Sequence, residues 1–418
     1  MGSDWSTLTG CLVMLIAERL LANDVTDYIR FRAVCSPWRQ HTEDPRVGDG
    51  LRPKYLPRSW IMLEETAPAA APFRNRLLNT GTGAVLAVDV PELEDHDVMG
   101  PTLGGLLTLR ERGGAYVLRL LHPFTRHLTE LPSLVTMIHA ASHDPKMVEP
   151  EYHQPTAIGL SDDHKAVAVF CGLVNKVAVA RPGDSHWKWV YVPHFHLESA
   201  ASLAGCFYAV SHVYIYQLES DGARGEPKLV PVAYVPVDAP SFRLTLVADD
   251  ERERLMLMKE VFYVHAGEEV PPEGPDMLTM PRVCVAYAVD MAARTIALSR
   301  LGARALFMGD DRAVWASPGA FSPGVAADTV YAGRPNRLFT VHECGIEADR
   351  PLTVVLHTHG LVSGLTRHAV FESDDGEDLN PMGIVETVSS YVASDRGGAA
   401  RPTMYVASHA RRGRGRGV

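Results

Sequence analysis

Short apolar runs with strand-like character recur from about residue 73 to about residue 408, and they constrain the fold more than any other feature. Side chains in these runs repeat with a period of two, and Gly, Pro, Asp and Asn separate one run from the next. This pattern is typical of β-strands joined by turns. The clearest runs are Ala166–Phe170, Val177–Ala180, Trp187–Val192, Val213–Tyr216, Arg254–Met258, Val283–Tyr287 and Thr353–Leu356.

The length of this all-β region narrows the architecture. Residues 73–408 contain too many short strands for one β-sandwich, and 46% of the 418-residue chain is hydrophobic, which is enough for a large core. We therefore expect a large all-β domain that forms a β-propeller of about six to eight blades. The sequence has no clean repeat that would fix the number of blades. A pair of β-sandwiches is the alternative architecture.

Residues 1–45 have a helical periodicity instead, and we expect a small all-α domain of three helices there. Asp24 can cap the second helix, because its side chain can accept a backbone N–H of the first turn. Ser36–Pro37 suits the N-cap and first turn of a short third helix. The first helix is amphipathic, and the residues that follow its 3.6-residue rhythm are Leu8, Leu12, Leu15, Ile16, Arg19 and Leu20.

Two segments without strand or helix patterns complete the domain plan. Residues 46–72 read as a linker, with a stretch rich in proline and alanine around residues 65–72. Residues 409–418 form a flexible tail of Arg and Gly. Such a tail can bind RNA by charge and stacking, but it has no aromatic residue and the whole chain carries a net charge of −10. We therefore favour a solvated tail, and we expect no nucleic-acid partner.

Cysteine usage and hydropathy indicate a reduced, intracellular protein, in the nucleus or the cytoplasm. None of the cysteines lies at metal-ligand or redox spacing from another, and no N-x-S/T sequon is present. The apolar stretch from Leu8 to Ala17 follows an acidic residue and is too short to cross a bilayer, so we expect no membrane partner. The cysteines are Cys11, Cys35, Cys171, Cys206, Cys284 and Cys344.

Paired aspartates and clustered histidines are the candidates for chemistry. Two close carboxylates can act as acid and base or bind a cation, but each pair here lies beside a short apolar run, which is typical of a turn. His357 and His359 would share one face of a strand; a metal site would need His342 and His368 as well, and we favour ordinary histidines. The aspartate pairs are Asp162–Asp163, Asp249–Asp250, Asp310–Asp311 and Asp374–Asp375.

Motifs of nucleotide-binding proteins and hydrolases are missing from the sequence. It contains no G-x-x-x-x-G-K-[ST], no G-x-S-x-G and no H-E-x-x-H. We therefore expect a protein that is not an enzyme and that uses no catalytic residue, cofactor or metal.

The N-terminal helices resemble an F-box. Leu8, Leu12, Ile16 and Leu20 match the first half of that family's pattern, and the run from Asp27 to Cys35, followed by Trp38–Arg39, matches the second half. Two departures stand out. Thr9 replaces the usual proline, which could loosen the first turn and weaken partner binding, and about three extra residues separate the halves.

The rest of the chain resembles the plant F-box proteins, of the type common in grasses, whose propeller was long listed as a domain of unknown function. The similarity covers nearly the whole chain. It lies in Trp5–Ser6 and in the segments "DPR" (44–46), "LPRSWIML" (56–63), "LLHPFTRHLTELP" (120–132), "RPGDSHW" (181–187) and "GARALFMGDDRAVWASPGAF" (302–321).

This resemblance implies the substrate receptor of a ubiquitin ligase of the Skp-cullin-F-box type. The F-box would dock on a Skp-type adaptor, which brings cullin and the RING subunit, and the propeller would hold an unknown target protein. Short helices need a partner surface to bury their apolar faces. The residues expected to contact the adaptor are Leu8, Leu12, Ile16, Leu20, Val34 and Trp38.

Two other functions fit the same sequence. The chain could be a propeller scaffold or regulatory protein-binding module outside any ligase. It could also be a propeller enzyme, or a propeller that binds a small ligand, with the site in its central channel.

Overall fold

A computed structural model of the chain describes most of the helical region and of the β-domain. The described residues are 5–63, 73–113, 116–141, 153–191, 196–220, 227–235, 243–262, 282–309, 312–321, 325–334, 337–345, 353–356 and 388.

The N-terminal helices form where the sequence pattern predicts them. A 3-10 turn, η1 (Trp5–Thr7), precedes α1 (Gly10–Asn23), α2 (Val25–Val34) and α3 (Ser36–Gln40). Asp24 ends α1 and caps α2, because its Oδ1 accepts the backbone N–H of Thr26 at 2.7 Å. Ser36 was expected as the N-cap of α3, but Cys35 holds that position and Ser36 is already helical. We call residues 5–41 the helical module.

The described part of the β-domain forms five sheets that follow one another along the chain. The short helix η2 (Pro53–Tyr55) precedes the first strand, and η3 (Pro91–Glu94), α4 (Val135–Ala141) and η7 (Pro318–Ala320) lie between strands. Sheet 1 contains β1 (Trp60–Met62), β2 (Arg74–Asn79) and β3 (Val85–Asp89). Sheet 2 contains β4 (His96–Val98), β5 (Leu107–Glu111), β6 (Val117–Leu121) and β7 (Leu128–Ser133).

Sheet 3 joins two antiparallel meanders through a parallel bridge between β8 and β13. Its first meander contains β8 (Ala157–Leu160), β9 (Val167–Cys171), β10 (Lys176–Ala180) and β11 (Lys188–Val190). Its second contains β12 (Leu197–Leu203), β13 (Cys206–Ser211), β14 (Tyr214–Ser220) and β15 (Pro227–Tyr234).

Sheet 4 contains β16 (Arg243–Asp249), β17 (Arg254–Phe262), β18 (Arg282–Asp290) and β19 (Thr295–Leu298). Sheet 5 contains β20 (Ala305–Met308), β21 (Ala313–Ala316), β22 (Thr329–Arg334), β23 (Arg337–Gly345) and β24 (Thr353–Leu356).

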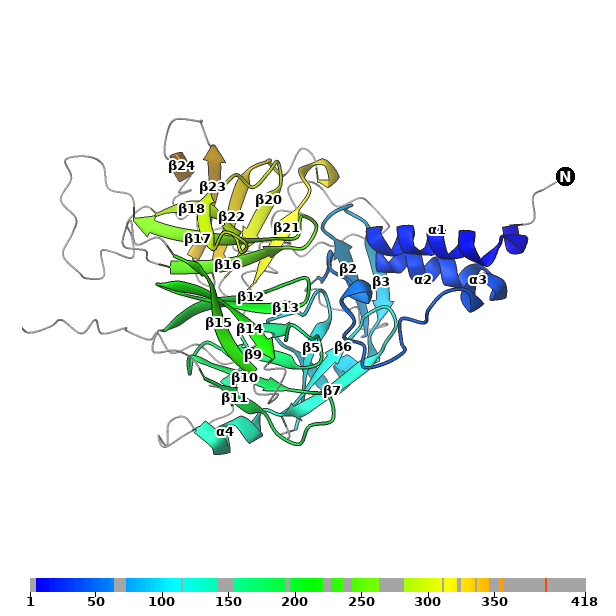
Figure 1. Ribbon diagram of the computed structural model, residues 1–418. Coiled ribbons are helices and arrows are strands. Elements are labelled where there is room, and N and C mark those ends of the chain that lie inside the picture. Colours follow the sequence, from blue (N-terminus) through cyan, green and yellow to red (C-terminus); the bar gives the residue numbers. More distant parts are fainter. Residues whose placement is uncertain are drawn as a thin grey trace, which may run out of the picture.

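Packing between successive sheets closes these elements into a ring, as expected for a propeller. Sheets 1 and 2 share a cluster that contains Leu77 of β2 and Leu109 of β5. Sheets 2 and 3 share another, which contains Leu120 of β6 and Val167 of β9. The two meanders of sheet 3 share one hydrophobic cluster. A second cluster joins sheet 3 to sheet 4, and a third joins sheet 4 to sheet 5. Phe307 of sheet 5 packs in one cluster with sheet 1. The fold is therefore mostly β and propeller-like (Figure 1), while the number of blades stays a prediction.

The segment that was expected as a linker contains ordered structure. Residues 51–59, which we call the connecting segment, lead from the helical module into β1 and include η2. Trp60 of β1 is only 4% exposed. Gly105, with φ of 86°, lies so close to Pro57 that a Cβ there would overlap the Pro57 carbonyl group. Only the part of the linker around residues 64–72 falls outside the described residues.

Candidate functional site

The helical module has a small core of its own that includes one residue of the connecting segment. Val13 and Ala17 of α1 are buried against Tyr28 and Phe31 of α2, and Tyr55 of η2 closes this cluster. Because α1 buries only one of its sides, most of its remaining apolar side chains face away from this core.

The opposite side of α1 exposes large apolar side chains to solvent. The exposed fractions are 48% for Leu12, 46% for Met14, 62% for Leu15 and 38% for Ile16. Val34, at the end of α2, is 63% exposed. Soluble proteins rarely leave such residues grouped in the open, and a grouped set marks an interaction surface. Leu12, Leu15 and Ile16 share one side of α1 through their i, i+3 and i+4 spacing. We call these three side chains, together with the exposed Val34 of α2, the docking face.

The residues expected to contact an adaptor divide into two groups. Leu12, Ile16 and Val34 are exposed, whereas the other three, Leu8, Leu20 and Trp38, are half-buried against the module core. Trp38 stacks on Phe31 with ring centroids 4.3 Å apart. Leu15 was not among the expected residues, although it lies three residues after Leu12 and shares its side of the helix.

Asp24 connects the module to sheet 1. Its carboxylate accepts the indole N–H of Trp60 at 3.0 Å and the side-chain amide of Asn79 at 2.9 Å. The same carboxylate caps α2. The Asp24 backbone N–H bonds to the Leu20 carbonyl oxygen at the end of α1, while its side chain caps α2 and binds the propeller.

The connecting segment forms a second attachment, to sheet 2. His122, in the turn after β6, donates from Nε2 to the carbonyl oxygen of Tyr55 at 3.0 Å. Nδ1 of His122 accepts the backbone N–H groups of Phe124 and Thr125, both at 3.3 Å. Burial lowers the pKa of His122 to about 4, so the neutral ring is the form that this site holds.

Glu43 organises the other end of this segment. Its carboxylate accepts hydrogen bonds from Lys54 at 2.6 Å and Tyr55 at 2.8 Å, and it pairs with Arg52. The hydrogen bond from Lys54, followed by those from Tyr55 and Arg52, lowers the pKa of Glu43 to about 2. The Glu43 backbone carbonyl also accepts the hydroxyl of Tyr28 at 2.7 Å.

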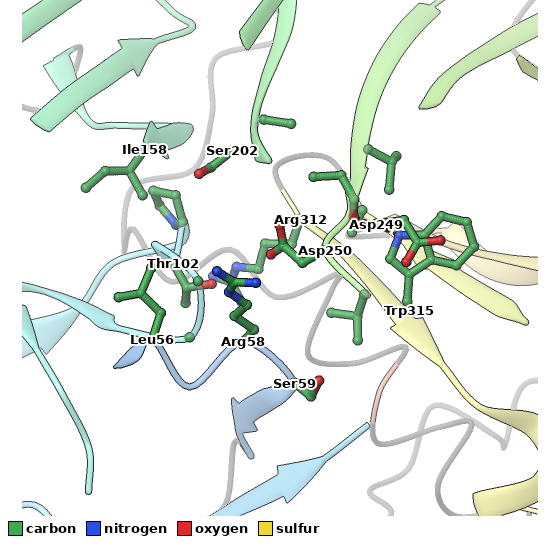
Figure 2. A pocket seen from close by; sticks show the side chains of 18 of the residues that line it. Leu56, Arg58, Ser59, Thr102, Ile158, Ser202, Asp249, Asp250, Arg312 and Trp315 are labelled. Atoms are coloured by element: carbon green, nitrogen blue, oxygen red, sulfur yellow. Dashed lines mark hydrogen bonds between the residues drawn. The ribbon is translucent and has the colours of Figure 1, made fainter. Parts of the chain in front are cut away.

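A cavity of about 920 Å³ lies between the sheets, and Figure 2 shows part of its lining. Residues of all five sheets or of their loops line it, including Trp60, Thr102, Ile158, Thr245 and Trp315. The C-terminal part of α1 and the start of α2, residues 18 and 21–25, border the same cavity, as does the connecting segment from Leu56. The helical module therefore forms part of the wall of this cavity.

Charged side chains lie in the lining of this cavity and beside it. Asp249 is fully buried and accepts hydrogen bonds from Arg304 at 2.7 Å and Arg254 at 2.9 Å. Its neighbour Asp250 accepts the backbone N–H of Ala204 at 2.7 Å, and burial raises the pKa of Asp250. Arg58 and Asp250 both line the cavity, and Figure 2 shows their side chains near each other.

The aspartate pairs lie in or beside turns where the structure describes them. Asp162–Asp163 follows β8, and Asp163 accepts the backbone N–H of Lys165 at 3.1 Å. Asp249 is the last residue of β16 and Asp250 begins the turn after it, so only the second aspartate of this pair is in a turn; the sequence also did not show that Asp249 is buried between two arginines. Asp310–Asp311, Asp374–Asp375, His357, His359, His368 and the Arg/Gly tail lie outside the described residues, and His342 is described only as backbone of β23.

The described residues contain neither a metal-binding cluster nor a membrane-spanning helix. No group of three or more His, Cys, Asp or Glu side chains among them is arranged to hold a metal ion. None of the helices in this part of the chain is long and apolar enough to span a membrane.

Comparison with protein families identifies the β-domain. The family model described as the KIB1-4 beta-propeller matches residues 77–346, which is more than half of the chain. The chain belongs to the KIB1-4 β-propeller family. This is the plant F-box-associated propeller family that the sequence resembles, so that prediction is confirmed. A KIB1-4 propeller is compatible with a protein-binding module, and the match begins after the helical module and β1.

Solved structures resemble the fold only distantly, and no curated protein matches the sequence. A structural genomics protein of unknown function from Bacteroides thetaiotaomicron is 8% identical with a TM-score of 0.33; the match covers 68% of this chain and 64% of that protein. A functionally unknown protein from Desulfotomaculum acetoxidans is 8% identical with a TM-score of 0.34, and the match covers 71% and 85%. A streptogramin B lyase is 10% identical with a TM-score of 0.27, covering 66% and 78%.

Proposed function

We propose that this chain is the substrate-receptor subunit of a Skp-cullin-F-box ubiquitin ligase. The helical module docks on a Skp-type adaptor, and the propeller recruits a target protein. The observation that carries the proposal is the docking face, a set of exposed apolar side chains on helices that are fixed to a propeller of an F-box-associated family.

The chemistry of the docking face suits a protein partner with an apolar helical surface. Leu12, Leu15 and Ile16 follow one another at the spacing of one helix side, and Val34 adds a branched side chain from α2. Burying such side chains contributes about 25 cal/mol for each Å² of apolar surface removed from water. An apolar helical groove on the partner is the surface that this face would fill.

The receptor does not catalyse ubiquitin transfer itself under this proposal. The adaptor links it through cullin to the RING subunit, which recruits the ubiquitin-loaded enzyme. Holding the target and the thioester in one complex raises their effective concentration, and this proximity is the receptor's contribution.

The test is binding of the purified full-length chain to a recombinant Skp-type adaptor. We expect the double variant Leu12→Asp, Ile16→Asp to weaken the Kd at least about a hundredfold, because two central apolar contacts of about 2 kcal/mol each are lost. Both side chains are exposed, so the fold should persist, which circular dichroism will check.

The matched control is the double variant Val85→Asp, Leu128→Asp. These two apolar side chains are 37% and 39% exposed and lie on the propeller, so the control adds the same charge at similar exposure. Its affinity for the adaptor should equal that of the wild type. A wild-type chain that does not bind the adaptor would contradict the proposal. Adaptor binding without any protein that accumulates on proteasome inhibition would favour the scaffold alternative.

A further inference from the structure

The helical module is attached to the propeller at two separate places. Asp24 contacts sheet 1, and Tyr55 contacts sheet 2 through His122. Phe124 of the turn after β6 also packs against the module core. A single attachment would allow the module to rotate, whereas two attachments on different sheets fix its orientation.

The Asp24 carboxylate has both of its oxygens engaged. Oδ1 accepts the Thr26 backbone N–H at 2.7 Å, and Oδ2 accepts Trp60 Nε1 at 3.0 Å and Asn79 Nδ2 at 2.9 Å. Hydrogen bonds to an ionised group are about twice as strong as those between neutral groups. An alanine at this position would remove the cap of α2 and both contacts with the propeller at once.

The two donors on the propeller are themselves held in place. Asn79 Oδ1 accepts the backbone N–H groups of Gly81 at 2.9 Å and Thr82 at 3.0 Å, which directs its amide nitrogen to Asp24. Trp60 is buried and meets Phe124 edge-on, with ring centroids 5.1 Å apart. The propeller therefore presents a rigid pair of donors to a rigid acceptor.

We propose that Asp24 is a positioning residue that sets the angle between the docking face and the propeller. The proposal rests on the proposed function, because that angle then sets the gap between a bound target and the ubiquitin-loaded enzyme. A chain with a free hinge would spread the target over many positions and lower the effective concentration of its lysines.

The variant that isolates this role is Asp24→Ser. Serine is as good an N-cap as aspartate, so α2 keeps its cap. Its single short hydroxyl cannot serve Thr26, Trp60 and Asn79 together. The matched control is Asp27→Ser on the same helix, because the Asp27 side chain is 47% exposed and pairs with Arg30 of the same helix at 3.0 Å.

The measurement is the distance distribution between two spin labels on unnatural amino acids. One label replaces the exposed Ala33 of α2, and the other replaces the exposed Lys165 in the turn after β8. We expect one narrow distance peak in the wild type and in Asp27→Ser. In Asp24→Ser the narrow peak should be lost to a broad or shifted distribution, while helix content and adaptor affinity stay at the wild-type level.

A second variant keeps the test decisive if Asp24→Ser disturbs folding. Trp60→Phe removes a donor on the propeller side and leaves the α2 cap untouched, and it should broaden the same peak. A narrow, unshifted peak in both variants overturns the positioning role, whatever the adaptor does. Failure of the wild-type chain to bind the adaptor overturns the proposed function, whatever the distances show.

Discussion

The backbone conformation of Thr9 is one that suits the proline found at this position in the F-box pattern. It is the N-cap of α1, with φ of −61° and ψ of 144°, and its side chain makes no capping hydrogen bond. Proline requires a φ near −65° and has no backbone N–H. The departure at Thr9 therefore leaves the expected geometry of the first turn in place.

Thr9→Pro should stabilise the chain. A proline that fits the native φ lowers the entropy of the unfolded chain, and we expect a gain of about 0.4–1 kcal/mol in the free energy of unfolding. Urea denaturation followed by tryptophan fluorescence would measure it. Thr26→Pro is the contrasting variant, because it removes the N–H that binds Asp24 and should destabilise the chain. A loss of stability in Thr9→Pro would show that this φ does not tolerate proline.

Local residue preferences predicted the cap at Asp24 but not its contacts with the propeller. The cap depends on residues two positions apart, whereas Trp60 and Asn79 are separated from Asp24 by 36 and 55 residues. Only the folded ring brings those positions together. The same reason explains why Asp249 was expected as a turn residue and not as a buried carboxylate.

The helices and strands follow the periodicity of the sequence closely. The three N-terminal helices and most predicted strand runs are present, because 3.6-residue and two-residue patterns depend on local geometry. The predicted docking residues divided into exposed and half-buried ones, since a helix with apolar residues on two sides does not reveal which side meets the protein's own core. Leu20 and Trp38 illustrate this, as both pack against the module core.

His122, in the turn after β6, should make the stability of the chain depend on pH. The unfolded histidine binds a proton near pH 6.5, but the folded one binds it only near pH 4, because the ring is buried. Between these values the unfolded state holds more protons, so the free energy of unfolding falls as the pH falls. The loss is on the order of 3 kcal/mol by pH 4.

Urea denaturation at several pH values from 6.5 to 4 would detect this dependence. His122→Asn, which keeps a donor and an acceptor but cannot titrate, should lose less stability than the wild type over this range. The control is His212→Asn, a histidine whose side chain is 55% exposed, which should keep the wild-type slope. Equal slopes in the wild type and His122→Asn would contradict the assignment.

Ring closure is the property of the whole molecule that the sequence predicted least directly. The number and spacing of the strand runs indicated a propeller. However, β1, which begins the first sheet at Trp60, lies within residues 46–72, which were predicted to be a linker. A three-residue strand has too few side chains to show a period. Its place becomes clear only when Ile61 and Leu63 pack in one cluster with Phe307 of sheet 5.

Asp249 should be the residue on which the seam between sheets 4 and 5 depends most. It ends β16 in sheet 4 and accepts hydrogen bonds from Arg304, which precedes β20 of sheet 5. Trp315 of β21 crosses the same seam and donates to the carbonyl oxygen of Ala248 at 2.8 Å. Removing one partner of a buried ion pair leaves the other charge without compensation, which costs about 3–5 kcal/mol.

Asp249→Asn should therefore lower the free energy of unfolding by about 3–5 kcal/mol, and chemical denaturation of the full chain would measure it. Asp162→Asn is the control, because it makes the same change at an exposed turn between two strands of one sheet.

The seam matters to function as well, since α1, the connecting segment and Asp249 border one cavity. Opening sheets 4 and 5 would thus disturb the surface that supports the helical module, and Asp249→Asn should broaden the distance between the Ala33 and Lys165 labels.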